Sequence, residues 1–257
     1  MRACRIAHQS LESPRYALIE GEHVFPFSAN YAIGHDETVN RSDQLPLHEV
    51  QLLAPVVPSK VVCVGRNYLE HAAELGNKMP EEPLLFLKPS SSVIASGDVI
   101  ELPAQSQQVE HEGELGVVIG RTARKLASDD DPLSYVFGYT CVNDVTARDL
   151  QRKDVQFTRG KSFDTFCPVG PWIVSNIDPQ NVEVTTKLNG ILKQKGNTAD
   201  MAFPVAFLIK YISEIMTLFP GDLIATGTPA GVSRMQNGDV VEVEVAGIGI
   251  LRNQISG

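Results

Sequence analysis

The sequence predicts a mixed α+β protein, mainly β, in which a small β-rich N-terminal domain precedes a larger domain. Most apolar stretches are short and are separated by Gly, Pro or Asn, which favours antiparallel or mixed strands over regular βαβ alternation. Only residues 204–216 show clear helical spacing of apolar side chains. The segment APVVPS at residues 54–59 is typical of a linker, so we place the boundary between the predicted domains, 1–57 and 58–257, beside it.

Within the N-terminal domain, residues 16–19 and 23–27 are the clearest strand candidates. In the larger domain the expected strands are 60–64, 84–87, 115–119, 136–142, 172–174, 182–188, 223–225 and 240–245. Asn189-Gly190 and Asn237-Gly238 are predicted hairpin turns, because Asn-Gly readily adopts the positive φ values of a type I′ turn. Pro204 suits the first turn of the predicted helix, and Pro220-Gly221 is its expected stop.

The composition is that of an ordinary globular protein. The chain has 257 residues, of which 21% are charged and 43% apolar, so neither disorder nor a membrane protein is expected. A net charge of −9 argues against a nucleic-acid partner, because phosphate binding needs a basic surface. It leaves an anionic small substrate open, since a few basic residues can still gather in one pocket.

The four cysteines are Cys4, Cys63, Cys141 and Cys167, and no two form a Cys-x-x-Cys pair. We interpret them as free buried thiols. No apolar run approaches the ~18 residues of a membrane span, and the first residues lack the apolar stretch of a signal peptide. These features predict a cytoplasmic protein with no membrane partner.

The first chemical signal is the run HEGELGVVIG at residues 111–120. If this run is a strand, Glu112 and Glu114 point to one face, because side chains alternate with period two. Two carboxylates roughly 5 Å apart repel by about 3 kcal/mol at an effective dielectric of about 20, which a divalent cation or a shared proton would relieve. His111 would face the other way, so we do not count it as a ligand.

The same spacing occurs at Glu242 and Glu244 in the run VVEVEVAG. There apolar and acidic residues alternate strictly, as on a half-exposed strand whose polar face is solvated. Spacing alone therefore does not identify a metal site.

A third carboxylate, Asp144, ends the apolar segment YVFGYTCVN. It could cap the helix expected over TARDLQRKD, although Thr146, with Asp149 three residues on, could fill that role. With Glu112 and Glu114 it makes a set of hard oxygen ligands, which suits Mg²⁺, Mn²⁺ or Ca²⁺ better than zinc.

Six runs of residues, in the same order, resemble the fumarylacetoacetate hydrolase family. They are VGRNYLEH (64–71), LFLKP (85–89), HEGELGVVIG (111–120), NDVTARDLQ (143–151), GKSFDTFCPVGP (160–171) and TGTPAGV (226–232). The resemblance covers about residues 58–257, and the N-terminal segment resembles the small extra domain of some bacterial members. One departure follows TGTPAGV, where many members continue with Gly-Pro and this chain has Ser233-Arg234.

The resemblance implies a β-roll core, usually in a homodimer, with Mg²⁺ or Mn²⁺ held at the positions of Glu112, Glu114 and Asp144. Members bind a small 2-oxo acid to the metal, which acts as a Lewis acid. The segment NYLEHAAELG is expected to form a short helix with Asn67 as its cap and Gly76 as its stop. On it, His71 and Glu74 share a face, as a solvated surface pair or, as the resemblance implies, as the general base that activates water.

The resemblance also implies roles for residues that could otherwise be ordinary surface or turn groups. Lys161 matches the lysine that points toward the substrate's oxygen atoms. Substrate contacts are expected from Gln151 and Arg148, although Arg148 could instead pair with Asp144 or Asp149. Further candidates are Thr228, Arg66 and Lys88; the hydroxyl and backbone N–H of Thr228 could bind a carboxylate or merely form a turn.

Three functions are compatible with these residues. The first is hydrolysis of a carbon–carbon bond in an acylpyruvate or fumarylpyruvate, with water activated by His71 and Glu74. The second is decarboxylation or tautomerisation of oxaloacetate, or isomerisation of a 2-hydroxyhepta-2,4-diene-1,7-dioate from aromatic catabolism, at the same site. The third is a catalytically silent metal-binding β protein, which the complete set of matching positions argues against.

Overall fold

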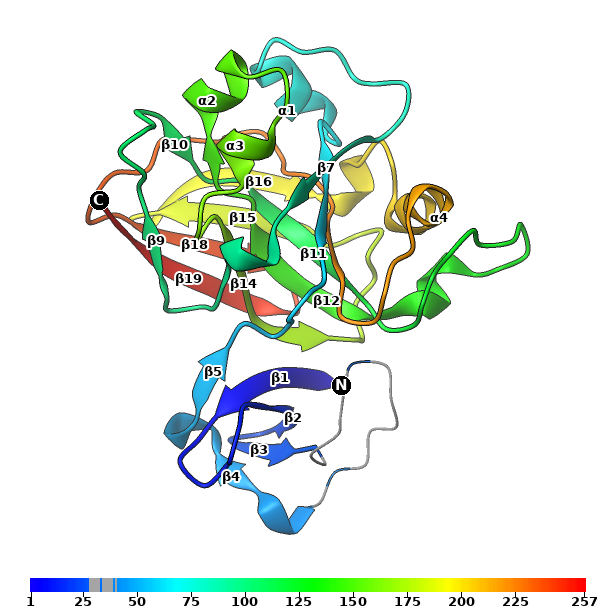
Figure 1. Ribbon diagram of the computed structural model, residues 1–257, viewed down its shortest axis with the longest axis vertical. Coiled ribbons are helices and arrows are strands. Elements are labelled where there is room, and N and C mark those ends of the chain that lie inside the picture. The colour runs from blue at the N-terminus through cyan, green and yellow to red at the C-terminus, as the bar shows by residue number, and fades with distance from the viewer. Residues whose placement is uncertain (28–32, 34–38, 40) are drawn as a thin grey trace.

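A computed structural model describes residues 1–27, 33, 39 and 41–257 of the chain, and its architecture is mainly β, with the helices around the edges (Figure 1). The predicted mixed, mainly β class is confirmed. Beyond the short 3-10 turns, the helices are α1 (Leu69–Glu74), α2 (Arg148–Lys153), α3 (Thr158–Lys161) and α4 (Val205–Ile215).

The larger of the two main sheets has twelve strands, in the order β4-β3-β2-β1-β14-β12-β11-β17-β6-β7, with β5 beside β1 and β8 beside β14. Most neighbours are antiparallel, but β17 pairs with β6, and β14 with β8, in parallel. Its strands are β1 (Arg2–Ala7), β2 (Arg15–Glu20), β3 (His23–Pro26), β4 (Leu45–Pro46), β5 (Gln51–Leu53), β6 (Val61–Gly65), β7 (Leu84–Lys88), β8 (Val93–Ile94), β11 (Gly113–Ile119), β12 (Val136–Asn143), β14 (Cys167–Val174) and β17 (Leu223–Ala225).

A second sheet has five strands in the order β16-β15-β18-β19-β9. They are β9 (Val99–Glu101), β15 (Glu183–Leu188), β16 (Ile191–Asn197), β18 (Val240–Val245) and β19 (Gly249–Ser256); the remaining strands β10 (Val109–Glu110) and β13 (Thr146–Ala147) pair with each other. Leu115 and Val117 of β11 share one hydrophobic cluster with Val184 of β15 and Val243 of β18. This shared core joins the two sheets behind the segment that carries the predicted glutamates.

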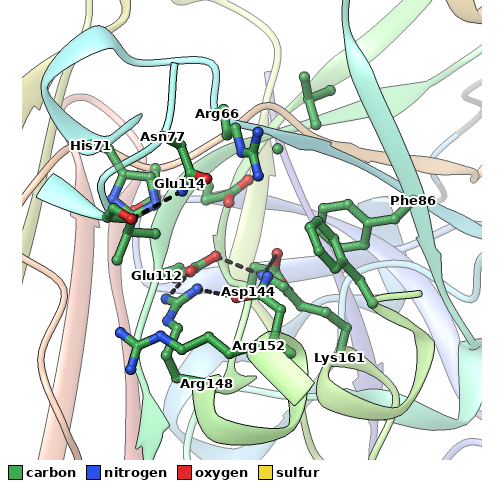
Figure 2. A pocket seen from close by; sticks show the side chains of 16 residues that line it. Arg66, His71, Asn77, Phe86, Glu112, Glu114, Asp144, Arg148, Arg152 and Lys161 are labelled. Atoms are coloured by element: carbon green, nitrogen blue, oxygen red, sulfur yellow. Dashed lines mark hydrogen bonds and ion pairs between the residues drawn. The ribbon is translucent and has the colours of Figure 1, made fainter. Parts of the chain in front are cut away.

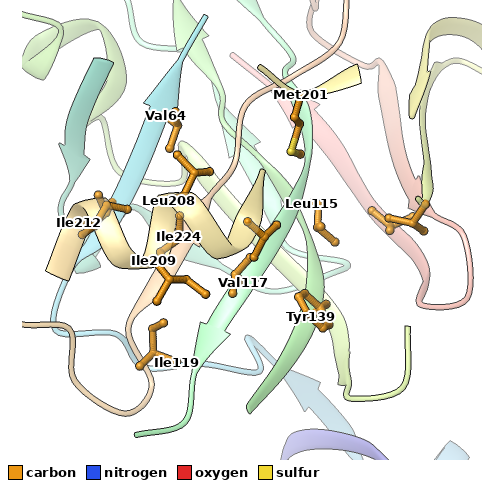
Figure 3. Close-up of a cluster of buried hydrophobic side chains, with 14 of the residues drawn as sticks. Val64, Leu115, Val117, Ile119, Tyr139, Met201, Leu208, Ile209, Ile212 and Ile224 are labelled. Atoms are coloured by element: carbon orange, nitrogen blue, oxygen red, sulfur yellow. The ribbon is translucent and has the colours of Figure 1, made fainter. Parts of the chain in front are cut away.

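Helix α4 packs on the larger sheet through the apolar face that its spacing predicts. Leu208, Ile209 and Ile212 are fully buried in the cluster that also contains Val64 and Ile224 (Figure 3). The helix ends at Ile215, before the expected stop at Pro220-Gly221. Ile215 itself lies on the exposed side, so the apolar pattern overestimates the length of the buried face.

The N-terminal strands lie at one end of the molecule (Figure 1). Cys4, Ile6, Ala17, Ile19 and Val24 form a small hydrophobic cluster of their own. Strand β1 nevertheless pairs with β14, so the larger sheet continues across the predicted domain boundary. The division at residue 57 stays a prediction.

Two local predictions have different outcomes. Asn189 and Gly190 both have positive φ and join β15 to β16, as predicted. At Asn237-Gly238 only the glycine has positive φ, and the turn leads into β18 without closing a hairpin. All four cysteines are free and buried, as predicted. Among residues 1–27, 33, 39 and 41–257, no helix is both long and apolar enough to cross a membrane.

Candidate metal centre and active site

Three buried carboxylates meet where β11 begins and β12 ends. The antiparallel register pairs Gly113 with Asn143, which puts Glu112 opposite Asp144. The Asp144 N–H donates to the Glu112 carbonyl oxygen at 2.8 Å, and the Glu112 N–H donates to Asn143 Oδ1 at 2.9 Å. One carboxylate oxygen from each of Glu112, Glu114 and Asp144 lies within 4.8 Å of the others.

Gly113 between the two glutamates allows β11 to approach the second sheet. A Cβ atom at this position would lie 2.1 Å from Thr186 Oγ1 of β15, a distance that real Cβ atoms do not adopt. The strand therefore needs glycine here for packing. His111, on the other side of Glu112, faces away from the carboxylates toward Gln194 and Ser233.

Buried cations surround two of the three carboxylates (Figure 2). Lys161 Nζ lies 2.7 Å from Glu112 Oε2 and 2.6 Å from Asp144 Oδ2. Lys88 Nζ lies 2.6 Å from Asp144 Oδ1. Burial alone would lower the pKa of Lys161, but Asp144 and Glu112 raise it to about 12, so this lysine stays charged.

Arg148 pairs with carboxylates other than the two that the sequence suggested. Its guanidinium binds Glu110, at 2.8 Å, and Glu112 rather than Asp144 or Asp149. A further donor of the group lies 2.6 Å from Gln151 Oε1. Arg148 is 2% exposed, so its donors are directed at the protein's own acceptors and hold Glu112 in place.

Glu114 differs from its two partners. It accepts one hydrogen bond, from the Gly227 N–H at 2.7 Å, and pairs with no cation in the part of the chain that the structure describes. Burial and the nearby charges of Asp144 and Glu112 raise its pKa well above the usual range. For Glu112, burial alone would also raise the pKa, but Lys161 and Arg148 lower it well below the usual range.

The donor set fits a hard divalent cation. All three ligands are carboxylate oxygens, the type that Mg²⁺ and Mn²⁺ prefer. Around the site the described residues include four buried carboxylates, those of Glu110, Glu112, Glu114 and Asp144, and three buried cations, those of Lys88, Arg148 and Lys161. With all four carboxylates ionised, a dication between Glu112, Glu114 and Asp144 would leave the site with a surplus of one positive charge, which suits an anionic substrate.

Helix α1 places His71 at the same pocket as the three carboxylates. His71 Nδ1 lies 3.2 Å from Glu74 Oε2, and His71 is 5% exposed, so it is not a solvated surface group. Asn67 does not cap this helix; its amide bonds to Phe203 and to the Thr226 carbonyl oxygen instead. Gly76, with φ of 71°, follows the helix end, as the sequence predicts.

A pocket of about 290 Å³ collects most of the predicted residues (Figure 2). Predicted residues that line it are Arg66, His71, Glu112, Glu114, Asp144, Arg148, Gln151, Lys161 and Thr228. Glu74 and Lys88 do not line it but contact His71 and Asp144 from behind. Asn77, Arg152 and the edge-to-face pair Phe86 and Phe157 also line the pocket. Phe86 belongs to the run LFLKP, but the sequence indicated a site role for none of the four.

Two of these lining residues, Arg66 and Thr228, have polar groups that contact no other described residue. Arg66 has φ of 57°, a conformation that costs a non-glycine residue energy and often marks a functional position. Its side chain forms no hydrogen bond or ion pair with any residue that the structure describes. The Thr228 hydroxyl donates to the Gly113 carbonyl oxygen at 2.8 Å. The Thr228 backbone N–H has no partner among the described residues, so it is available to a ligand.

Comparison with known proteins agrees with this geometry. A profile described as "Fumarylacetoacetate (FAA) hydrolase C-terminal" matches residues 60–256, and one described as "Rv2993c-like, N-terminal" matches residues 1–55. The chain is 44% identical to oxaloacetate tautomerase YisK of Bacillus subtilis over 224 residues, which cover 81% of this chain and 74% of the relative.

Two solved structures extend the likeness over the whole chain. The 2-hydroxyhepta-2,4-diene-1,7-dioate isomerase from Mycobacterium marinum is 41% identical with a TM-score of 0.89, and the match covers 100% of this chain and 98% of that one. Maleylpyruvate hydrolase from Sphingobium sp. SYK-6, solved with manganese(II) and pyruvate, is 31% identical with a TM-score of 0.80 and coverage of 100% and 99%. The chain belongs to the fumarylacetoacetate hydrolase family, whose relatives named here are enzymes.

Proposed function

We propose that this chain is a Mg²⁺- or Mn²⁺-dependent hydrolase that cleaves a carbon–carbon bond in a small 2,4-dioxo acid of the acylpyruvate or fumarylpyruvate type. One observation carries the proposal: the three carboxylates and the His71–Glu74 pair meet at one pocket. The pocket thus combines a site for a dication with a candidate general base.

Glu112, Glu114 and Asp144 would hold the metal ion. When bound, such an ion supplies Lewis-acid polarisation of the substrate's 2-oxo and carboxylate oxygens. Lys161 and Arg148 keep Glu112 ionised, and Lys161 and Lys88 form ion pairs with Asp144. The manganese and pyruvate of the Sphingobium relative support both the metal and the 2-oxo acid.

His71 takes the proton of the attacking water. Because its Nδ1 faces Glu74, Nε2 is the nitrogen left for the pocket. As Nε2 accepts the proton, the water oxygen bonds to the distal carbonyl carbon, C4. The bond from C3 to C4 then breaks, its electron pair forms the enolate of pyruvate, and a proton returned to C3 completes the reaction.

Residues on the pocket wall would orient the substrate. Arg66, which has no carboxylate partner among the described residues, and the Thr228 N–H suit the substrate's carboxylate oxygens. Gln151 is held by Arg148 at the same wall. Phe86 and Phe157 supply an apolar surface for the carbon chain.

A second candidate function is keto-enol tautomerisation of oxaloacetate. It is favoured by the tautomerase relative, YisK, which is more similar in sequence to this chain than the hydrolase relative is. In this reaction His71 would move a proton to or from C3, and no water would attack. Isomerisation of a 2-hydroxyhepta-2,4-diene-1,7-dioate, suggested by the Mycobacterium marinum relative, would use the same base. Decarboxylation of such a substrate is a further alternative at the same site.

Assays of the purified, Mg²⁺-loaded protein on acetylpyruvate, fumarylpyruvate and oxaloacetate separate these functions. Hydrolysis is expected to consume both acylpyruvates with release of pyruvate, and His71→Ala should abolish that release. Rapid oxaloacetate enolisation without cleavage of either acylpyruvate would favour the tautomerase. Turnover of none of the three substrates would contradict both proposals.

A further inference from the structure

Gln194 is a fully buried amide on β16 of the five-stranded sheet, outside the pocket. Its Oε1 lies 3.0 Å from the Gly113 nitrogen and 3.0 Å from His111 Nδ1. Its Nε2 lies 2.7 Å from Thr228 Oγ1 and 2.7 Å from the Pro229 carbonyl oxygen. One side chain thus joins the strand that carries the glutamates to the segment that carries Thr228.

Backbone groups fix the orientation of this amide. The Gly113 N–H can only donate, so the carboxamide oxygen must face it, and the Pro229 carbonyl can only accept, so the amide nitrogen must face that side. The oxygen then accepts from His111 Nδ1–H, which leaves His111 Nε2 to accept from the Ser233 hydroxyl at 2.8 Å. Ser233 is the position where this chain departs from the Gly-Pro of many family members.

Residues 226–231, here called the site loop, contact Glu114, Glu74 and the strand that carries the glutamates. The Gly227 N–H donates to Glu114, and the Gly231 N–H donates to Glu74 at 3.0 Å. The Thr228 hydroxyl donates to the Gly113 carbonyl oxygen and accepts from Gln194. The position of the site loop therefore affects three groups together: the carboxylate of Glu114, the carboxylate of Glu74 that contacts His71, and the free Thr228 N–H.

We propose that Gln194 is a positioning residue, which holds the site loop against Gly113 so that the Thr228 N–H meets the substrate's carboxylate. The proposal rests on the proposed function, because that function supplies the 2-oxo acid. Gln194 touches no substrate and acts through Thr228. If Gln194 only stabilised the fold, its replacement would leave kcat and KM unchanged in a variant that still folds.

A double-mutant cycle between Gln194 and Thr228 tests this action. Gln194→Met keeps the length of the side chain but removes all four contacts, and we expect kcat/KM to fall about 10- to 100-fold, with a clear rise in KM. Thr228→Ala removes the hydroxyl through which Gln194 acts. The double variant should therefore be no worse than about the poorer single variant, because contacting residues are not additive.

Asn253 offers a matched control. It is a buried amide on β19 of the same sheet, and it donates to the carbonyl oxygens of Ala95 and Asp98, away from the pocket. Asn253→Leu should lower the melting temperature but leave kcat and KM at wild-type values. If Gln194→Met does not fold, Gln194→Asn replaces it in the cycle. Asparagine keeps the amide but is too short to contact both Gly113 and Pro229.

Hydrogen exchange of the metal-free protein provides a readout that needs no substrate. In the Gln194 variant, the amides of Gly227 and Gly231 should exchange faster than in wild type and in Asn253→Leu. Wild-type kcat and KM in the folded Gln194 variant, or losses that multiply in the double variant, would overturn the proposal. If the wild-type protein turns over no 2-oxo acid, the proposed function fails, and unchanged exchange would then overturn the positioning role separately.

Discussion

Replacing Glu114 by glutamine should stabilise the metal-free protein and remove its response to Mg²⁺. Glu114 is buried beside two other carboxylates, and no described cation pairs with it. In the metal-free protein the repulsion of its charge by Glu112 and Asp144 outweighs the attraction by Lys161, whereas a bound dication would be attracted by all three carboxylates. The substitution keeps the shape of the side chain and the acceptor for the Gly227 N–H.

The magnitude follows from the distance between the carboxylates. At the 4.8 Å limit, two like charges repel by about 3 kcal/mol at an effective dielectric of about 20. Proton uptake by Glu114, whose pKa is raised, and the charge of Lys161 reduce this repulsion. We therefore expect Glu114→Gln to increase the free energy of unfolding of the metal-free protein by about 1 to 3 kcal/mol, or about 2 to 4 °C in melting temperature per kcal/mol.

Thermal unfolding with and without Mg²⁺ measures both effects. A ligand at a hundred times its dissociation constant stabilises by about 2.7 kcal/mol, so wild type should gain several degrees and Glu114→Gln almost none. Glu244→Gln is the control, because Glu244 has the same spacing from Glu242 on the half-exposed strand β18, and it should change stability by less than about 0.5 kcal/mol. A metal-free Glu114→Gln protein that is less stable than wild type, or that keeps the full Mg²⁺ shift, would refute the reasoning.

Three further substitutions test other parts of the pocket. His71→Ala should lower kcat by about 10²- to 10⁴-fold in steady-state assays but keep the Mg²⁺-induced rise in melting temperature; retained acylpyruvate cleavage would remove His71 as the base. Lys161→Met should destabilise the metal-free protein by about 3 to 5 kcal/mol, because two carboxylates lose a buried partner, and should enlarge its stabilisation by Mg²⁺; an unchanged unfolding curve would contradict this. Gly113→Ala should cost at least about 1 to 3 kcal/mol in denaturant unfolding, and adding Thr186→Ala should recover part of the loss by removing the clashing hydroxyl; no recovery would place the strain elsewhere.

The glutamate pair could be predicted because its geometry is local. Period-two alternation puts Glu112 and Glu114 on one side of an extended segment, and the apolar run that Asp144 follows is the adjacent strand β12. The control pair, Glu242 and Glu244, lies on a strand of alternating burial, as its own alternating pattern indicates. Sequence reasoning could not give the register of β11 and β12, which brings Asp144 opposite Glu112.

Contacts between distant segments explain most of what was missed. Arg148 was expected to contact substrate or, alternatively, to pair with Asp144 or Asp149 nearby in sequence. It binds Glu110 and Glu112 instead, next to the pairing of β10 and β13. Gln194 lies 83 residues from His111 and carries no motif. Such partners are set by how segments distant in sequence pack against one another, and no local pattern encodes that packing.

Strands with mixed polarity were also difficult to predict. β1, β16 and β19 carry charged or amide side chains on their open faces, so their apolar signal is weak, whereas the continuous apolar runs of β11 and β12 are easily identified. The predicted homodimer, the absence of a nucleic-acid partner and the domain boundary at residue 57 stay predictions, because they concern partners and independent folding rather than the conformation of one chain.

The most direct test of the metal centre is an anomalous difference map from crystals of the wild-type protein grown with Mn²⁺. We predict one peak per chain, within coordination distance of Glu112, Glu114 and Asp144, with Lys161 moved from at least one of its carboxylates. A map without a peak between these three side chains, at a Mn²⁺ concentration that supports turnover, would contradict the account.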